Sequence, residues 1–133
     1  MKIAILIARI VLGLMFLVFG LNGLLHFMPN PPMPPSDAVT MLTILGTHKY
    51  LTVIGILMII GGVLILVGRY VPLGLTLIGP ILVNILLIHL TLMGGHGIAL
   101  GLVATVLWFF LFVVYRASFY GLFAADPLPA TKL

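Results

Sequence analysis

The sequence has no cysteine and no glutamate, and it has few charged residues of any kind. Without cysteine the chain can form no disulfide, no thiolate metal site and no thiol-based catalytic centre. Asp37 and Asp126 are its only acids, and charged residues make up 6% of the chain, against about 25% in a soluble domain. Hydrophobic residues make up 63%. Most of the surface must therefore face something other than water.

The positive charge is also sparse. The net charge of +4 comes from six Lys and Arg residues that are scattered along the chain. Scattered cations make no basic stripe of the kind that binds phosphates. We therefore expect no nucleic-acid partner.

Four apolar stretches are long enough to cross a bilayer, whose hydrocarbon core needs about 20 apolar residues in a helix. Leu, Ile and Val dominate them without a polar–apolar alternation, which favours helices over membrane β-strands. The first stretch has no A-x-A-like cleavage site, so we interpret it as a span rather than a signal peptide. We predict an all-α fold, with one membrane domain over 1–133 built as a four-transmembrane-helix bundle. The predicted helices cover about 3–28, 50–67, 72–93 and 97–115.

The predicted connections differ in length. VGRYVP (67–72) and GGHG (94–97) are tight turns, whereas the first connection is a Pro-rich outer loop over 29–48. Within that loop Ser36 is a candidate N-cap for a short helix over 37–45. This helix is too short to span, so we expect it to lie at the membrane interface or to fold over the mouth of the bundle. Residues 116–133 form a C-terminal tail.

Positive charges divide unevenly between the two ends of the predicted bundle. Lys2, Arg69, Arg116 and Lys132 fall on one side if the four spans alternate, and Lys49 is the exception. Cytoplasmic loops carry an excess of Lys and Arg. We therefore predict that both termini are cytoplasmic, and that the Pro-rich loop and the GGHG turn face outward.

Arg9 is a charged residue inside the first predicted span, where an ionised group usually has a partner or a function. It shares a helix face with Gly13, Gly20 and Gly23, and small residues let helices approach closely. Arg9 either snorkels to the interface at the end of this glycine seam or contacts an anion or lipid headgroup. We give Arg69 the same interfacial or anion-contact role.

Four polar residues near the outer ends of the spans are candidate ligand-binding residues: Asn22, His26, Asn84 and His89. Asn22 and His26 share a helix face, and Asn84 lies one turn beyond Pro80, where we expect a kink. Grouped at the edge of one cavity, these side chains could bind a quinone, a lipid-like molecule, a haem or a metal. His26 and His89 are the candidate metal ligands. The alternative is that the cluster only holds helices together, with His48 and His96 solvated in loops.

The fourth predicted span is rich in aromatic residues. We expect Trp108, Phe109, Phe110 and Phe112 to face lipid or partner subunits rather than a cofactor. Gly97, Gly101 and Thr105 are small residues at four-residue spacing, which marks a place where another helix can press closely.

Three segments carry a resemblance to a known family. ARIVLGLMFLVFGLNGLLHFMP, PPMPPSDA and GGVLILVGRYVPLGLTLIGPILVNILLIHL follow one another along the chain. Together they resemble the DoxX-like family of small four-helix membrane proteins, over about residues 8–120. The matching positions are the Pro-rich loop and Arg9, Gly13, Gly20, Asn22, Gly61, Gly62, Arg69, Pro72, Pro80, Asn84 and His89.

The resemblance implies a fold and a location more than a reaction. Members of the family include small membrane subunits associated with archaeal quinol oxidase and thiosulfate:quinone oxidoreductase, and the family has no agreed catalytic residues. We therefore expect an integral protein of a prokaryotic inner (cytoplasmic) membrane. Its expected role is an accessory subunit of a membrane redox or respiratory complex, with a quinone- or lipid-binding polar cluster near the outer side.

Catalysis by this chain alone is not expected, because no carboxylate lies in a predicted span and no cysteine can carry electrons. A quinone is the favoured cofactor and haem the less favoured one. The expected partners are membrane lipids, and other membrane subunits or further copies of the chain. Two alternatives remain open: a purely structural or assembly subunit of a larger membrane complex, and a small carrier of lipid or hydrophobic solute.

Overall fold

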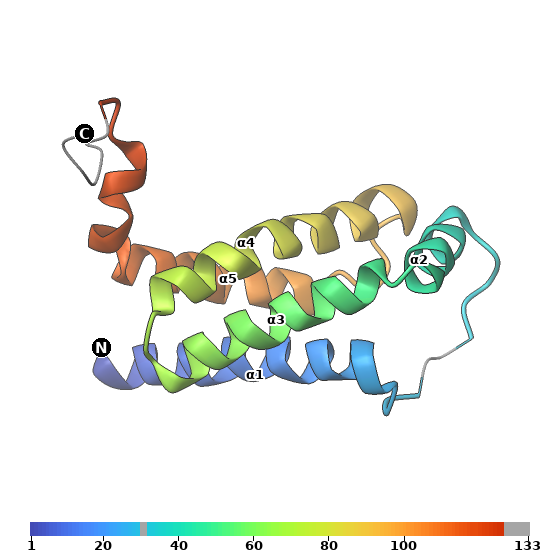
Figure 1. Ribbon diagram of the computed structural model, residues 1–133, viewed down its shortest axis with the longest axis horizontal. Helices are drawn as coiled ribbons and strands as arrows, with labels where there is room; N and C mark the ends of the chain where they lie inside the picture. The colour runs from blue at the N-terminus through green and yellow to red at the C-terminus, as the bar shows by residue number, and fades with distance from the viewer. Residues whose placement is uncertain (30–31, 127–133) are drawn as a thin grey trace, which may run out of the picture.

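The structure is a computed structural model that describes residues 1–29 and 32–126. All the regular elements in these ranges are helices, which confirms the all-α prediction (Figure 1). Two parts of the predicted connections lie outside the described residues: residues 30 and 31 of the Pro-rich loop, and residues 127–133 of the tail, which include Lys132. The elements are α1 (Lys2–Leu25), α2 (Asp37–Thr47), α3 (Tyr50–Val67), α4 (Val71–Leu87), the π-helical turn η1 (Ile88–Leu92), α5 (Ala99–Val114) and the 3₁₀ helix η2 (Arg116–Phe123).

Several of these helices could cross a membrane. Three of them, Lys2–Leu25, Tyr50–Val67 and Val71–Leu92, are long and apolar enough to do so. A fourth, Ala99–Val114 with Arg116–Phe123, qualifies if the two helices are one span with a bend of 81°. The described part of the chain thus has the composition of a membrane protein.

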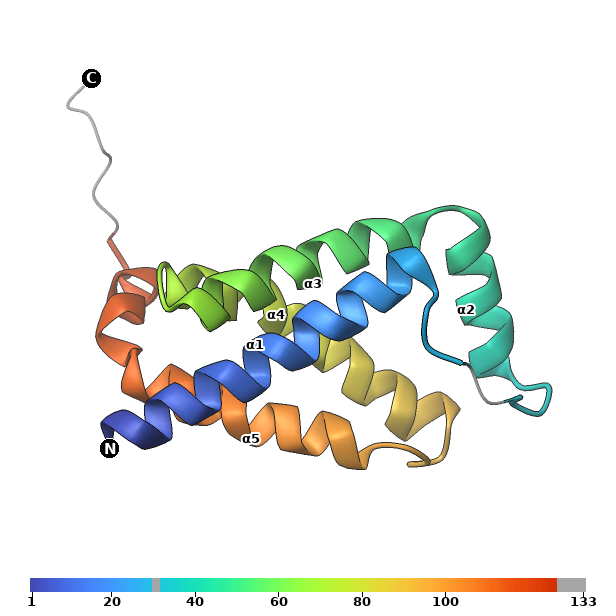
Figure 2. The ribbon, with the colours of Figure 1, turned by 90° about the horizontal axis from the view of Figure 1, so that it is seen from below.

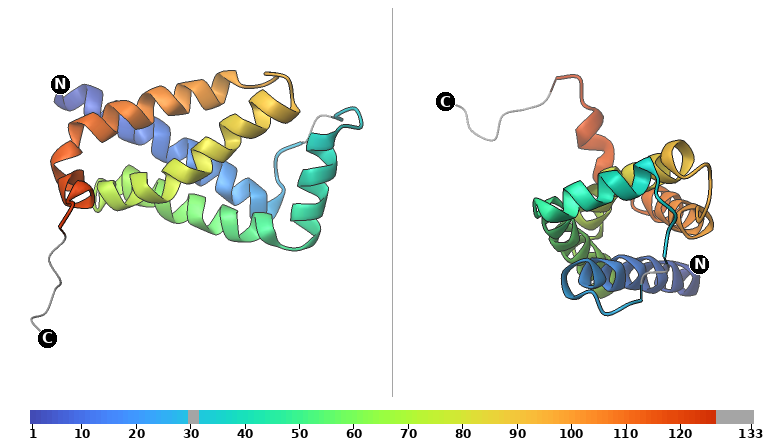
Figure 3. Two further views of the ribbon diagram at one scale, coloured as in Figure 1. Left: turned by 90° about the horizontal axis from the view of Figure 1, so that it is seen from above. Right: turned by 90° about the vertical axis from the view of Figure 1, so that its right-hand side faces the viewer.

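The long helices form a ring. Helix α1 contacts α3 and α5, and α4 contacts the same two helices (Figure 1). The start of α1, the end of α5 and the α3–α4 turn lie at one end of the ring, and α2 lies at the other (Figures 1 and 2). Seen from the α2 end, α2 crosses from the start of α3 to η1, and it contacts both (Figure 3, right).

Paired glycines hold α1 against α3. A Cβ added to Gly13 would lie 2.8 Å from the carbonyl oxygen of Gly62, and a Cβ on Gly62 would lie 2.8 Å from that of Gly13. Gly20 and Gly55 form a second pair with corresponding distances of 2.9 and 3.1 Å. The predicted seam is therefore correct for Gly13 and Gly20. It is wrong for Gly23, where an added Cβ would meet nothing within 4 Å.

The two halves of the ring differ in packing. Large side chains that are completely buried, including Leu12, Ile65, Leu75 and Leu111, lie toward the end with the α3–α4 turn. At this end Gly74 of α4 also approaches α3, since a Cβ on it would lie 2.9 Å from a backbone oxygen. Toward α2, by contrast, α4 leaves α3 and approaches α5 (Figure 2; Figure 3, left). The half next to α2 is consequently less filled.

The aromatic residues of α5 mostly face inward, contrary to the prediction. Trp108 donates from Nε1 to the carbonyl oxygen of Leu75 in α4 at 2.9 Å and stacks on Phe112 with a ring separation of 5.2 Å. Phe110 and Phe112 also pack against the buried core. Only Phe109, which is 58% exposed, faces outward as predicted. Gly79 makes room for the indole, because a Cβ there would lie 3.3 Å from Trp108 Cζ2.

Local capping sets the ends of α1 and α2. Ser36 accepts a hydrogen bond from the Val39 amide at 3.3 Å, which confirms it as the N-cap of α2. Helix α1 ends at Leu25, earlier than the predicted residue 28, because His26 adopts a left-handed conformation with φ 52°. His26 donates its amide to the carbonyl of Asn22 and terminates the helix.

Candidate functional site

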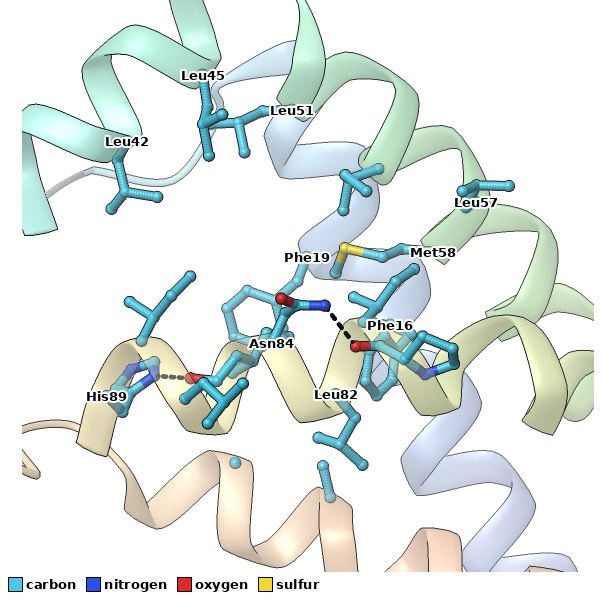
Figure 4. Close-up of a pocket in the computed structure, with 18 of the residues that line it drawn as sticks. Phe16, Phe19, Leu42, Leu45, Leu51, Leu57, Met58, Leu82, Asn84 and His89 are labelled. Carbon is cyan, nitrogen blue, oxygen red and sulfur yellow. Dashed lines mark hydrogen bonds between the residues drawn. The ribbon is translucent and has the colours of Figure 1, made fainter. Parts of the chain in front are cut away.

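A cavity of about 1010 Å³ occupies the less filled half of the ring (Figure 4). Its walls are almost entirely aliphatic and aromatic. Leu42 and Leu45 of α2 and Leu51 of α3 lie along one side, and Asn84 projects from α4 on the opposite side (Figure 4). The remaining wall residues include Met15, Phe16 and Phe19 of α1, Ile54, Leu57 and Met58 of α3, Pro80, Ile85 and Ile88 near the end of α4, and Leu100, Gly101 and Ala104 of α5.

The cavity follows from the path of α4. Close glycine contacts hold α3 to α1 along its length and to α4 near the α3–α4 turn. Beyond that contact α4 diverges from α3, and α2 covers the end of the space between them (Figure 2; Figure 3, left). Pro80 lines this part of α4, where it has no N–H to donate to Thr76. The helix nevertheless continues to Leu87.

Asn84 is oriented by its own helix. Its Nδ2 donates to the carbonyl oxygen of Pro80 at 2.9 Å (Figure 4). A carbonyl oxygen can only accept, so the amide nitrogen must be the atom on that side. Oδ1 consequently points toward the space between Asn84 and the leucines of α2 (Figure 4). Within the described residues nothing donates a hydrogen bond to this oxygen.

His89 lies in the π-helical turn and is oriented in a similar way. Its Nδ1 lies 2.7 Å from the carbonyl oxygen of Ile85. Because that oxygen can only accept, Nδ1 carries a proton, and when the ring is neutral Nε2 is an acceptor. The turn is widened by the bond from the Met93 amide to the Ile88 carbonyl at 3.1 Å. Such π-helical turns occur frequently at functional sites.

Two threonines add polar atoms to the wall. Thr76 donates its hydroxyl to the carbonyl of Pro72 at 2.8 Å, and Thr91 donates to that of Leu87 at 2.6 Å. Tyr50, at the start of α3, also lines the cavity and is 55% exposed. Among the polar wall residues only Asn84 and His89 come from the predicted set.

The structure splits the predicted cluster of four residues. Asn84 and His89 line the cavity, whereas Asn22 and His26 do not. Asn22 Oδ1 accepts a hydrogen bond from the Met28 amide at 2.8 Å, so this side chain stabilises the chain reversal after α1. His26 terminates α1 and is exposed. The prediction assumed that helix 1 continued through His26, but α1 ends at Leu25, and Asn22, which is still helical, is paired with the Met28 amide.

Arg9 binds within the molecule. It donates from Nε to the carbonyl oxygen of Ile65 at 3.1 Å and from Nη2 to that of Leu66 at 3.3 Å. These carbonyls belong to the last turn of α3, where a cation is also favoured by the helix dipole. Gly68 ends the helix with φ 81°, and a Cβ on it would collide with the guanidinium. Arg69 is exposed in the following turn, and neither arginine lines the cavity.

The histidines make no recognisable metal centre. Within 1–29 and 32–126, no group of three or more His, Asp or Glu side chains is placed to hold a metal ion. His26, a candidate metal ligand with His89, does not line the cavity that His89 lines. His48 and His96 are exposed, as predicted for loop residues. His96 borders a second cavity of about 400 Å³ beside Ser36 and Leu92.

Sequence reasoning placed the short helix α2 at the membrane interface or over the mouth of the bundle, but it named none of its residues as part of a site. Met41, Leu42 and Leu45 line the cavity, and their spacing along the short helix is the signal that could have placed them there. The aliphatic wall of α3 had no comparable signal, since after Thr52 its sequence is entirely apolar.

Comparison with known proteins does not add to this picture. A scan against protein-family models, a search of curated proteins and a search of solved structures each find no match to the chain. The functional argument therefore rests on the cavity.

Proposed function

We propose that the chain is a DoxX-like accessory subunit of a membrane redox complex, and that it binds a quinone- or lipid-like amphiphile in the cavity. In this proposal α1, α3, α4 and the α5–η2 pair are four spans, and α2 lies at the outer interface. Both termini are cytoplasmic. The observation that supports the proposal most directly is a large apolar cavity with polar groups from Asn84 and His89.

The distribution of side chains supports the placement in a membrane. Large apolar residues are exposed along the outside of every long helix, among them Val11, Val53, Val83 and Val106. A soluble monomer rarely exposes so continuous an apolar surface. Lys2, Arg69 and Arg116 lie at or near the end of the ring opposite α2, and Lys49 follows α2. An apolar belt between charged ends is the pattern that a bilayer requires.

The cavity has the size and chemistry of an amphiphile site. Ligand pockets are typically about 300–1,000 Å³ and have apolar walls with a few orienting polar groups. This cavity of about 1010 Å³ reaches the upper end of that range. Its polar atoms can orient a head group, and the aliphatic walls can surround a hydrocarbon tail. A quinol, a quinone or a lipid has these two parts.

The side chains around the cavity support binding more than catalysis. Asp37 and Asp126 are the only acids in the sequence, and neither lines the cavity. A bound molecule therefore has no carboxylate beside it to exchange protons with. Redox chemistry on a quinone would accordingly take place on a partner subunit, with this chain holding the molecule nearby.

Purification of the full chain in mild detergent, followed by extraction and mass spectrometry, tests the proposal. We expect a stoichiometric quinone or lipid, and we expect it to be lost when Met58→Trp or Leu45→Trp fills the cavity. Val53→Trp, on an exposed face of α3, is the matched control and should retain it. An empty wild-type protein that co-purifies with other subunits would instead support the purely structural role.

A further inference from the structure

We infer that the cavity selects amphiphiles whose head donates hydrogen bonds, so that it takes a neutral hydroxyl-bearing molecule such as a hydroquinone or a lipid alcohol. Heads that only accept, such as the corresponding quinone, should bind more weakly. This inference rests on the proposed function and specifies the ligand of the same site.

The protons of the polar wall groups are largely used within α4 and η1. Asn84 Nδ2 donates to Pro80, and His89 Nδ1 donates to Ile85. The Thr76 and Thr91 hydroxyls donate to backbone carbonyls one turn earlier. Each of these four bonds ends on a carbonyl oxygen, which cannot donate, so its direction is fixed.

The atoms left to meet a ligand are therefore mainly acceptors. They are Asn84 Oδ1 and His89 Nε2, together with the hydroxyl oxygens of Thr76 and Thr91, which lie about 10 Å or more from Asn84 along the helix axis, so that one head group meets only part of this set. The second amide hydrogen of Asn84 is the one donor left on these four side chains. Tyr50, whose hydroxyl can both donate and accept, does not alter this imbalance. A head group with hydroxyls satisfies acceptors that a quinone carbonyl would leave unpaired.

The charges of the molecule exclude a cationic donor. An ammonium head would also satisfy the acceptors, but a buried cation needs an opposite charge nearby. No aspartate lines the cavity, the sequence has no glutamate, and its net charge is +4. The donor must therefore be neutral, which leaves a hydroxyl as the fitting group.

Binding of matched ligands to the full chain in lipid nanodiscs tests the inference. Trp108 is the only tryptophan and follows the wall residue Ala104 by one helical turn, so its fluorescence can report occupancy. The ligands are a decyl hydroquinone kept anaerobic, its dimethyl ether, the decyl quinone, a diacylglycerol and the methyl ether of that diacylglycerol. Asn84→Leu and His89→Leu remove the acceptors, and Asn22→Leu is a matched change outside the cavity.

We expect the hydroquinone to bind about tenfold more tightly than the dimethyl ether or the quinone, since its hydroxyls donate hydrogen bonds to wall acceptors and the other two heads cannot. Asn84→Leu and His89→Leu should reduce this preference, and Asn22→Leu should keep it. A preference for the diacylglycerol over its methyl ether, without one for the hydroquinone, would assign the site to lipid alcohols. Equal binding of donors and non-donors by wild-type protein would overturn the inference and leave the proposed function intact. Absence of binding by every ligand would overturn both.

Discussion

Gly13 of α1 and Gly62 of α3 lie so close that neither position has room for a side chain. A Cβ on either residue would lie 2.8 Å from the carbonyl oxygen of the other. Both obstructing atoms belong to helix backbones, which cannot move aside as the end of a flexible side chain can. The contact fixes α3 against α1 and leaves α4 as the helix that diverges to open the cavity.

Substitution of one of these glycines should destabilise the protein. We expect Gly13→Ala to be less stable than Gly23→Ala by about 1–3 kcal/mol, the usual cost of overpacking. Gly23 is the matched control because it lies in the same helix and an added Cβ would meet nothing within 4 Å. Reversible denaturation in detergent micelles, followed by helical circular dichroism, measures the difference. Equal stability of the two variants would contradict the close contact.

Loss of the Arg9 side chain should loosen the end of α3. Arg9→Met removes two hydrogen bonds from a charged donor to the carbonyls of Ile65 and Leu66. We expect a loss of about 1.5–3 kcal/mol, with faster amide exchange in the last turn of α3. Hydrogen exchange with mass spectrometry measures this locally, and peptides from α2 provide the control. Unchanged exchange near Gly68 would show that Arg9 does not cap the helix.

Trp108 should stabilise the α4–α5 contact through its indole N–H. Trp108→Phe removes the bond to the Leu75 carbonyl at 2.9 Å and keeps an aromatic ring in place. We expect a loss of about 1 kcal/mol. Phe109→Leu, at a site that is 58% exposed, should change the stability by about 0.5 kcal/mol or less. Thermal unfolding of both variants tests the comparison, and a larger effect at Phe109 would reverse the assigned orientation of α5.

The absence of native cysteine makes the topology directly testable. Single cysteines at exposed positions 36 and 96, introduced as Ser36→Cys and His96→Cys, should react with a membrane-impermeant maleimide added to intact cells. Arg69→Cys should react only after the cells are opened. Ala8→Cys, at a buried site, is the control for non-specific labelling. Labelling of Arg69→Cys alone in intact cells would invert the proposed orientation.

The sequence predicted the helices well because hydropathy and glycine spacing are local properties. The run of apolar residues located the potential spans, Ser36 located the start of α2, and Arg9 with Gly13 and Gly20 marked a packing face. These signals depend on residue types at fixed separations along one helix. They can be identified without knowing which other helices or which solvent surround the helix.

Which face of each helix points into the bundle could not be predicted in the same way. A helix exposed to lipid is as apolar on its outer face as in the core, so the periodicity that separates inside from outside in soluble proteins is weak. Trp108 was for this reason predicted to face outward. The early end of α1 depends on His26 adopting a left-handed conformation, and His is only modestly favoured there. The divergence of α4, which creates the cavity, depends on contacts among three helices.

The π-helical turn makes the cavity wall sensitive to chain length. Its hydrogen bond from Met93 to Ile88 spans one residue more than an α-helical bond does. Deleting one residue between 88 and 92 would let an ordinary α-helix form and would leave the residues beyond the deletion close to their present orientation, because the π-turn holds one residue more than an α-turn over nearly the same rotation. The side chains that such a length change would exchange are therefore those of the turn itself, which includes His89.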